Sequence, residues 1–108
     1  MLPLGALATL EGFRTMNRPF RTFADGDTSP DVTGWSWFKV SNTAATTIDG
    51  FAGAVEGQEI VLIATTANTT LEDASNGSTL KLAGGADRTL AADELVRFIH
   101  DGTNWYEA

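Results

Sequence analysis

The sequence predicts an all-β fold, and a compact β-sandwich, a jelly-roll-like domain and a barrel all fit it. Short apolar runs alternate with turn-forming residues at a spacing of about 8–12 residues, as in sandwiches and barrels. Threonine, a β-branched residue that favours strands over helices, is frequent. No window of about 11–18 residues shows a sustained helical period. With 108 residues, the chain has the length of one such domain.

The first half of the predicted domain contains a polar loop and three strands. Residues 25–34 form the loop, which is marked by proline and glycine. Residues 35–40 form a strand with aromatic side chains on both faces, so we expect it to be buried on both sides or to lie at a subunit contact. A short strand follows at residues 46–48. Residues 59–65 form the strongest strand, whose continuous apolar run predicts a central position in its sheet.

The second half contains the remaining predicted strands. Residues 68–76 are expected to form a strand and a turn, with the Asn76-Gly77 pair at a hairpin corner. Residues 79–82 alternate cleanly, with both leucines pointing inward. Residues 95–100 and 104–107 pair as a terminal hairpin, which brings the last aromatic residues beside an apolar strand.

The formal charge of −7 is unevenly distributed, and its distribution divides the chain into two parts. Residues 1–24 carry three arginines and one acidic side chain, whereas residues 25–108 carry four basic and thirteen acidic side chains. We therefore expect an N-terminal arm over residues 1–24 and a β-domain over residues 25–108. The acidic excess also argues against nucleic acid as a main partner, because phosphates require a basic surface.

The chain starts with the apolar segment MLPLGALATL. This segment lacks a positively charged region and contains Pro3 and Gly5, so we expect no secretory signal. It is also far shorter than the ~20 residues that span a membrane. It either packs on its own domain as a strand or short helix, or docks as an arm in a partner's groove with its arginines on acidic surface. The side chains expected to contact the partner are Leu2, Leu4, Leu7, Leu10, Phe13, Arg14, Arg18 and Arg21.

The residue types that support catalysis are scarce. The chain has no cysteine, which excludes disulfides, thiolate nucleophiles and zinc–thiolate sites. The single histidine, His100, precedes Asp101, but no G-x-S-x-G motif supplies a serine nucleophile. Nothing in the sequence marks a pair of carboxylates as buried for glycoside hydrolysis. We therefore expect no catalytic residues, no cofactor and no enzymatic activity.

Two sets of residues are candidates for ligand binding. Acidic side chains at alternate positions of the polar loop resemble the first half of a calcium loop; they are Asp25, Asp27 and Asp31. Pro30 and Ser36 stand where such a loop has glycine and glutamate, so we expect a solvated turn and no metal. The second set consists of aromatic residues that either pack in a core or at a subunit contact, or form a platform for glycan rings. They are Trp35, Trp37, Trp105 and Tyr106.

Three segments carry a family resemblance, and they are FKVSNTAATTIDGFAG (38–53), VEGQEIVLIATTANTTL (55–71) and LAGGADRTLAADELVRFIHDGTNWYEA (82–108). Together they resemble a small Thr/Gly-rich β module of bacteriophage virion proteins, found in head decoration proteins and at tail-fibre and tailspike ends. The resemblance implies a homotrimer that is made in the host cytoplasm, is not secreted and resides in the virion. Many relatives carry the module on a long shaft, whereas this chain has 37 residues before it.

We therefore expect a capsid decoration (cement) protein on the capsid surface. Its partners would be the major capsid protein and further copies of itself, without nucleic acid or membrane. A trimer would enlarge a marginal core, and binding only to the assembled shell would stabilise that shell by mass action. One alternative is a head-fibre or tail-fibre tip that adheres to host glycans, and another is a carbohydrate-binding module or a small hydrolase such as a depolymerase.

Overall fold

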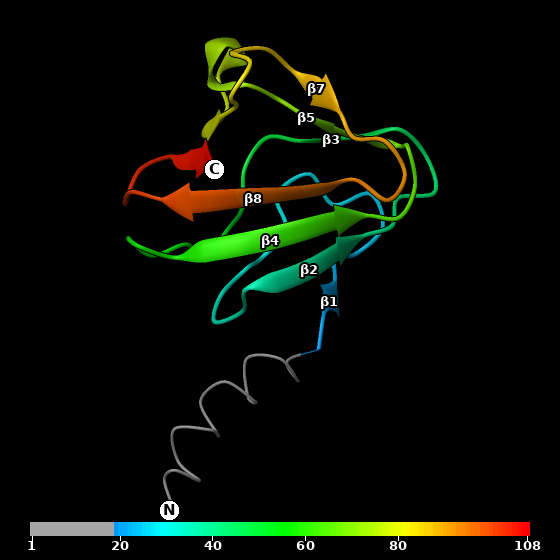
Figure 1. Ribbon diagram of the computed structural model, residues 1–108, viewed down its shortest axis with the longest axis horizontal. Coiled ribbons are helices and arrows are strands. Elements are labelled where there is room, and N and C mark those ends of the chain that lie inside the picture. Colours follow the sequence, from blue (N-terminus) through cyan, green and yellow to red (C-terminus); the bar gives the residue numbers. More distant parts are fainter. Residues whose placement is uncertain (1–18) are drawn as a thin grey trace, which may run out of the picture.

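The computed structural model describes residues 19–108 and folds them into two β-sheets that pack face to face (Figure 1). The larger sheet has the strand order β1-β2-β4-β8-β9-β6, and the smaller has the order β3-β5-β7. The strands of the larger sheet are β1 (Arg21–Thr22), β2 (Trp37–Val40), β4 (Glu59–Ala64), β8 (Leu95–His100), β9 (Trp105–Glu107) and β6 (Leu80–Lys81). Those of the smaller sheet are β3 (Thr46–Ile48), β5 (Thr69–Leu71) and β7 (Arg88–Thr89). The all-β sandwich predicted from the sequence is confirmed.

The larger sheet is built around β4 and β8. These two strands pair antiparallel from Glu59 opposite Ile99 to Ile63 opposite Leu95, and β2 lies parallel to β4 on the other side. The terminal hairpin of β8 and β9 forms as predicted, with Ile99 opposite Tyr106. The central position of β4 is also confirmed, since strands flank it on both sides.

The hydrophobic core fills the space between the two sheets. Alternate side chains of β2, β4 and β8 point inward and are buried, as period-two strand geometry requires. Phe51 joins the aromatic part of the core, with ring centroids 5.8 Å from Phe98 and 5.6 Å from Trp105. Full burial of an aliphatic or aromatic side chain of this size contributes roughly 1.5–3 kcal/mol, so this layer supplies most of the driving force for folding.

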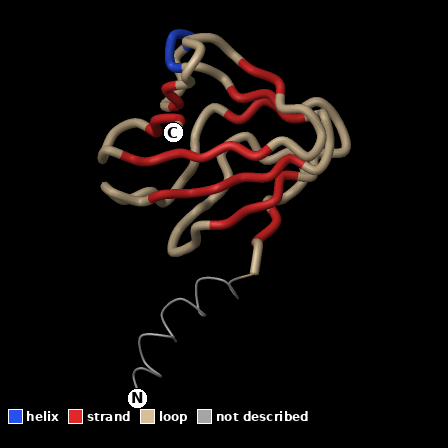
Figure 2. Tube along the Cα trace, in the orientation of Figure 1, coloured by secondary structure: helices blue, strands red, loops and turns tan. Residues whose placement is uncertain are grey.

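The segment after β5 departs from the prediction. Residues 74–76 form a short 3-10 helix, η1 (Ala74–Asn76), which is drawn in blue in Figure 2. Asp73 caps its start by accepting a hydrogen bond of 2.9 Å from the backbone N–H of Ser75, and Gly77 ends it at φ 101°. The predicted hairpin corner at Asn76-Gly77 is therefore wrong. The capped turn instead carries the chain from β5 in the smaller sheet to β6 in the larger one.

Residues 21–23, which the charge pattern assigned to the arm, lie within the domain. Arg21 and Thr22 pair parallel with β2, and the Phe23 ring stacks on Phe38 with centroids 4.8 Å apart. Phe23 is buried in the core. A two-residue edge strand has too little hydrophobic pattern to be recognised in a sequence, which explains why β1 was missed. Across residues 19–108, no helix has the length and apolar character needed to cross a membrane.

Candidate functional site

The outer faces of the two sheets differ in chemistry. On the smaller sheet, Thr47, Thr70 and Thr89 lie side by side in register across the three strands. The hydroxyl oxygens of Thr70 and Thr89 are 2.9 Å apart and share a hydrogen bond. This is the polar face that a sandwich normally presents to water.

The outer face of the larger sheet is mainly apolar. We define this outer face by the side chains that alternate with the buried ones, together with Phe20, which packs against Trp37 with ring centroids 5.7 Å apart. Its members are Phe20, Trp37, Lys39, Glu59, Val61, Ile63, Lys81, Leu95, Arg97, Ile99 and Tyr106. Val61 and Ile63 are half-buried, whereas Leu95 is 59% exposed and Tyr106 is 44% exposed. Large apolar side chains thus lie on the solvent side of the sheet.

Strand pairing makes this surface contiguous. One row across the sheet consists of Trp37, Val61 and Arg97. The next row consists of Lys39, Ile63 and Leu95. A third row runs across β4, β8, β9 and β6 and consists of Glu59, Ile99, Tyr106 and Lys81. Contiguous apolar surface of this kind marks interaction sites in soluble proteins.

The charge of the outer face also differs from that of the rest of the domain. The face carries three cations and one carboxylate, Glu59, which pairs with Arg97 at 3.0 Å. The other described residues carry twelve carboxylates and two basic side chains, Arg21 and Arg88. The outer face is therefore a weakly basic, apolar surface on a strongly acidic domain.

The aromatic candidates from the sequence divide between the surface and the core. Trp37 and Tyr106 lie on the outer face, as a subunit contact or glycan platform would require. Trp105 is 1% exposed and packs against Phe51, so the expectation that it contacts a subunit or a glycan is wrong. Period-two alternation along β9 explains the split, because it turns Trp105 inward and Tyr106 outward.

Trp35 and Arg21 form a separate contact at the edge of the sheet. Trp35 packs partly against the core, and the Arg21 guanidinium lies 4.9 Å from the centre of its ring. Arg21 is the described member of the arm residues predicted to bind a partner. The others lie outside the described residues; they are Leu2, Leu4, Leu7, Leu10, Phe13, Arg14 and Arg18.

The carboxylates of the acidic loop accept hydrogen bonds from nearby residues. Asp25 accepts hydrogen bonds from the backbone N–H (3.0 Å) and hydroxyl (2.7 Å) of Thr43, and Asp31 accepts two from Thr33. These hydrogen bonds lower the pKa of each carboxyl group, and the bond from the threonine hydroxyl contributes most. Asp27 caps its own turn at Ser29. Among residues 19–108, no three His, Cys, Asp or Glu side chains are grouped so as to hold a metal ion.

A shallow groove of about 370 Å³ lies beside Trp35, between the loops that precede β2 and β4. Its central amide, Gln58, is already engaged. The Gln58 Nε2 group donates to the carbonyl oxygens of Val32 (2.9 Å) and Trp35 (3.1 Å), and Oε1 accepts from the Val55 N–H (3.2 Å). Gln58 therefore holds the two loops together, and its amide is not free to bind a ligand in the groove.

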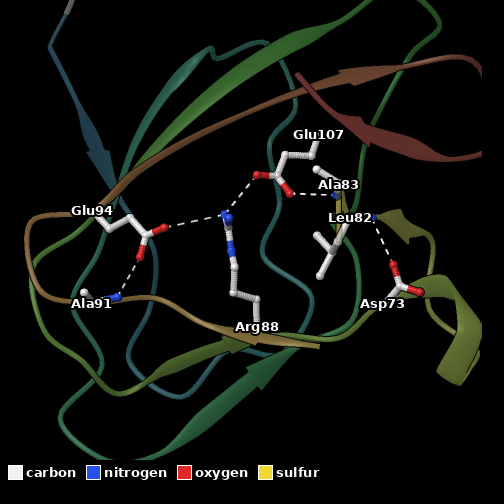
Figure 3. A network of polar contacts seen from close by, with 7 residues as sticks. All are labelled: Asp73, Leu82, Ala83, Arg88, Ala91, Glu94 and Glu107. Carbon is white, nitrogen blue, oxygen red and sulfur yellow. Dashed lines mark hydrogen bonds and ion pairs between the residues drawn. The ribbon is translucent and has the colours of Figure 1, made fainter. Parts of the chain in front are cut away.

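A polar network centred on Arg88 connects β7 of the smaller sheet with β9 of the larger one (Figure 3). Arg88 on β7 reaches Glu107 at 3.0 Å and Glu94 at 3.7 Å, so one guanidinium lies between two carboxylates. Glu107 also accepts a hydrogen bond of 3.0 Å from the Ala83 N–H, and Glu94 accepts one of 2.8 Å from the Ala91 N–H. Glu107 thus links the larger sheet to β7 of the smaller one, whereas the contacts of Glu94 lie within the segment that runs from β7 to β8. Both acids have a structural role.

His100 lies at the end of β8, as predicted, and its side chain is buried. Its ring packs on Trp105 with centroids 4.6 Å apart, and Nδ1 accepts a hydrogen bond of 3.1 Å from the Gly102 N–H. His100 therefore packs in the terminal hairpin and stabilises its turn.

The comparisons with known proteins give one finding. A family model described as "phage depolymerase C-terminal beta sandwich domain" matches residues 21–106. The matched segment begins with β1 and ends within β9, so it covers both sheets and the whole outer face except Phe20. No curated protein and no solved structure matches the chain.

Proposed function

Since the chain belongs to the family of phage depolymerase C-terminal β-sandwich domains, we propose that it is a non-catalytic assembly module of the phage particle. The family is a β module of virion proteins, and the chain is a phage virion structural protein. The observation that carries the proposal is the apolar outer face of the larger sheet. We propose that this face is buried when the module joins the virion.

Burial of the outer face would supply useful binding free energy. Leu95 is 59% exposed, Tyr106 is 44% exposed, and Phe20 and Ile99 are each 40% exposed. Covering a half-exposed side chain of this size contributes roughly 1 kcal/mol, from about 25 cal/mol per Å² of apolar area. The threonine face of the smaller sheet offers little comparable gain, which supports the larger sheet as the contact surface.

The arrangement of the acidic residues supports a non-catalytic role. Glycoside hydrolysis uses two carboxylates, one of which acts as the general acid and the other as base or nucleophile. Glu94 and Glu107 are close enough to share a partner, but both pair with Arg88 and accept backbone hydrogen bonds. These contacts engage both carboxylates in structural roles.

We propose the tail as the first candidate location, because the matching family is named after phage depolymerases. Capsid decoration, the function expected from the sequence, is the second candidate. The leucines and arginines of residues 1–18 support this candidate, because they contrast with the acidic domain and would suit docking on the major capsid protein. The acidic surface argues against nucleic acid as a partner in either location.

Counting the protein in purified virions separates the two locations. Quantitative mass spectrometry against the major capsid protein should give a low copy number for a tail module and hundreds for a decoration protein. Gold-labelled antibody should then bind the tail in the first case and the shell in the second. Absence of the protein from purified virions would contradict both.

Incorporation of variants tests the outer face itself. A phage that lacks the gene is complemented with the variant Leu95→Glu/Ile99→Glu or with the matched control Thr47→Glu/Thr89→Glu, which places the same two charges on the threonine face. We expect the first variant to be missing from virions and the control to be incorporated like the natural protein. Equal incorporation of both would show that the outer face is not the attachment surface.

A further inference from the structure

We propose that Asn76 is a site of spontaneous deamidation, which its hydrogen bond to Asp87 slows and whose product repels Asp87. Asparagine followed by glycine is the pair most prone to this reaction, because glycine has no Cβ to shield its amide nitrogen. Asn76-Gly77 is the one such pair in the sequence. It lies at the end of η1 and outside the outer face, so the modification goes beyond the assembly function and is tested separately from it.

Both reacting residues lie at the surface. Asn76 and Gly77 are exposed to solvent. Within the described domain, no atom beyond the chain neighbours of Gly77 lies within 4 Å of the position that a Cβ on this glycine would occupy. Water and hydroxide, on which deamidation depends, therefore reach the site.

The reaction involves these two residues and water alone. Hydroxide removes the proton of the Gly77 N–H, and the nitrogen then attacks Asn76 Cγ. As the new N–Cγ bond forms, the Cγ–Nδ2 bond breaks, and Nδ2 leaves as ammonia with a proton taken from water, which regenerates hydroxide. Water then opens the resulting succinimide ring: cleavage of the N–Cγ bond gives aspartate, whereas cleavage at the main-chain carbonyl carbon gives isoaspartate. Either product replaces a neutral amide with a carboxylate.

Two hydrogen bonds hold the reacting groups in the folded turn. Asn76 Nδ2 donates to Asp87 Oδ1 at 2.7 Å, and the Gly77 N–H donates to the carbonyl oxygen of Ala74 at 3.0 Å. The attack on Cγ needs a side chain free to rotate and a nitrogen free to lose its proton, so both bonds have to break first. Asp87 fastens the same turn a second time, because Oδ1 also accepts from the Asp73 N–H at 2.8 Å. The turn is therefore protected while Asp87 holds it closed.

The product disturbs this turn. A carboxylate at position 76 has no N–H to donate, so it would face the Asp87 carboxylate across the present contact of 2.7 Å. Two negative charges so close together repel each other. The disturbance reaches both sheets, because Asp87 is bonded to Asp73, which accepts a hydrogen bond of 3.0 Å from the Leu82 N–H just after β6. Deamidation should therefore loosen the link between β5 and β6.

Ageing of the full chain at mildly alkaline pH tests whether Asn76 is the site. Peptide mass spectrometry measures the conversion at each asparagine, and chromatography resolves aspartate from isoaspartate. Asn68 and Asn104 serve as references in the same sample, since Thr69 and Trp105 follow them. Asn76 should convert faster than either reference in the folded protein, and roughly tenfold faster again in urea, where the hydrogen bonds of the turn are broken. Conversion of Asn76 no faster than that of the references, or at the same rate folded and in urea, would overturn the proposal.

Removal of the Asp87 carboxylate tests its protective role. Asp87→Ala takes away the acceptor of both hydrogen bonds, so the folded variant should convert Asn76 roughly tenfold faster than the natural protein. The matched control is Asp27→Ala, which removes a carboxylate that caps a different turn, at Ser29, and should leave the rate unchanged. In urea all three proteins should convert at the same rate, and a difference that persists there would contradict protection by the folded turn. If folded Asp87→Ala converts Asn76 at the natural rate, the proposal is wrong.

Two variants reproduce the charge of the product and then compensate for it. Asn76→Asp should melt at a lower temperature than the natural protein, because it sets two carboxylates against each other. Asn76→Asp/Asp87→Asn exchanges the carboxylate and the amide, so the contact regains a donor and an acceptor and should recover most of the loss. Circular dichroism melting measures all three proteins and establishes that each is folded. Equal melting temperatures for Asn76→Asp and the natural protein, or no recovery in the double variant, would contradict the repulsion at Asp87.

Discussion

Removal of the Glu107 carboxylate should destabilise the domain far more than removal of an exposed carboxylate of the same type. Glu107 is 12% exposed, forms an ion pair with Arg88 Nη2 and accepts a hydrogen bond from the Ala83 N–H, each at 3.0 Å. Hydrogen bonds to charged groups contribute about 1.5–3 kcal/mol, and breaking a fully buried ion pair costs about 3–5 kcal/mol. Arg88 is 39% exposed, so water screens part of this loss. We therefore expect Glu107→Ala to reduce the free energy of unfolding by about 2 kcal/mol.

The matched control is Glu59→Ala, which breaks the pair with Arg97. That pair has the same length of 3.0 Å, but its side chains are 52% and 49% exposed. Exposed pairs contribute about 0–1 kcal/mol, so the control should lose less than about 0.5 kcal/mol. Urea unfolding, followed by tryptophan fluorescence at one fixed protein concentration, measures both values. Equal losses for the two variants, or a loss below about 0.5 kcal/mol for Glu107→Ala, would refute the structural role of the network.

Three further predictions concern the loops. Gly53 has φ 79°, and a Cβ there would collide with the Thr33 hydroxyl and lie 2.6 Å from Asp31 Oδ1. Gly53→Ala should therefore lower the free energy of unfolding by roughly 2 kcal/mol, measured by thermal unfolding. An unchanged melting temperature would contradict this prediction. Hydrogen bonds lower the pKa of Asp73, and those from Ser75 contribute more than the one from Leu82, so the folded state prefers the carboxylate. The resulting stability is present above the ordinary pKa of about 3.9 and is lost as the pH falls below it. Melting temperatures of Asp73→Asn should accordingly depend less on acid than those of the natural protein, and parallel curves would count against this. Calcium and a chelator should leave the melting temperature unchanged, because hydrogen bonds already engage the loop carboxylates, Asp27 and Asp31 within the loop and Asp25 with Thr43; a shift on adding calcium would support a metal site there.

Strand positions with strong alternation could be predicted from the sequence. The alternating segment at residues 79–82 contains β6, and the apolar run at residues 95–100 forms β8 over the predicted residues. The short strand predicted at residues 46–48 is β3. The two-residue strands β1 and β7 could not be found, since they depend on pairing with distant segments and not on a local pattern. The turn at Asn76-Gly77 was misread because the nearby Asp73 cap stabilises a 3-10 helix there.

The candidate site was predictable only in part. The sequence placed aromatic residues on both faces of the strand at residues 35–40 and predicted either burial on both sides or a subunit contact, and Trp37 lies half-buried on the outer face. The run at residues 59–65 was interpreted as a central strand, which is correct, but its apolar positions have two different surroundings. Ile60 and Leu62 are buried, whereas Val61 and Ile63 face outward. A continuous apolar run has the same sequence pattern whether one face or both faces of the strand are buried. The outer face could therefore be identified only from the structure.

Footprinting of the outer face in intact virions tests the central claim most directly. Hydroxyl-radical oxidation of Leu95, Ile99 and Tyr106, quantified by mass spectrometry, reports whether solvent reaches these side chains. The reference is the isolated Lys39→Glu/Lys81→Glu variant, which keeps all three residues and is used at a protein concentration at which light scattering gives the mass of one chain. Burial of the outer face predicts oxidation several-fold slower in the virion than in the reference. Equal rates in the two samples would show that the outer face stays open to water and would contradict its role as the assembly surface.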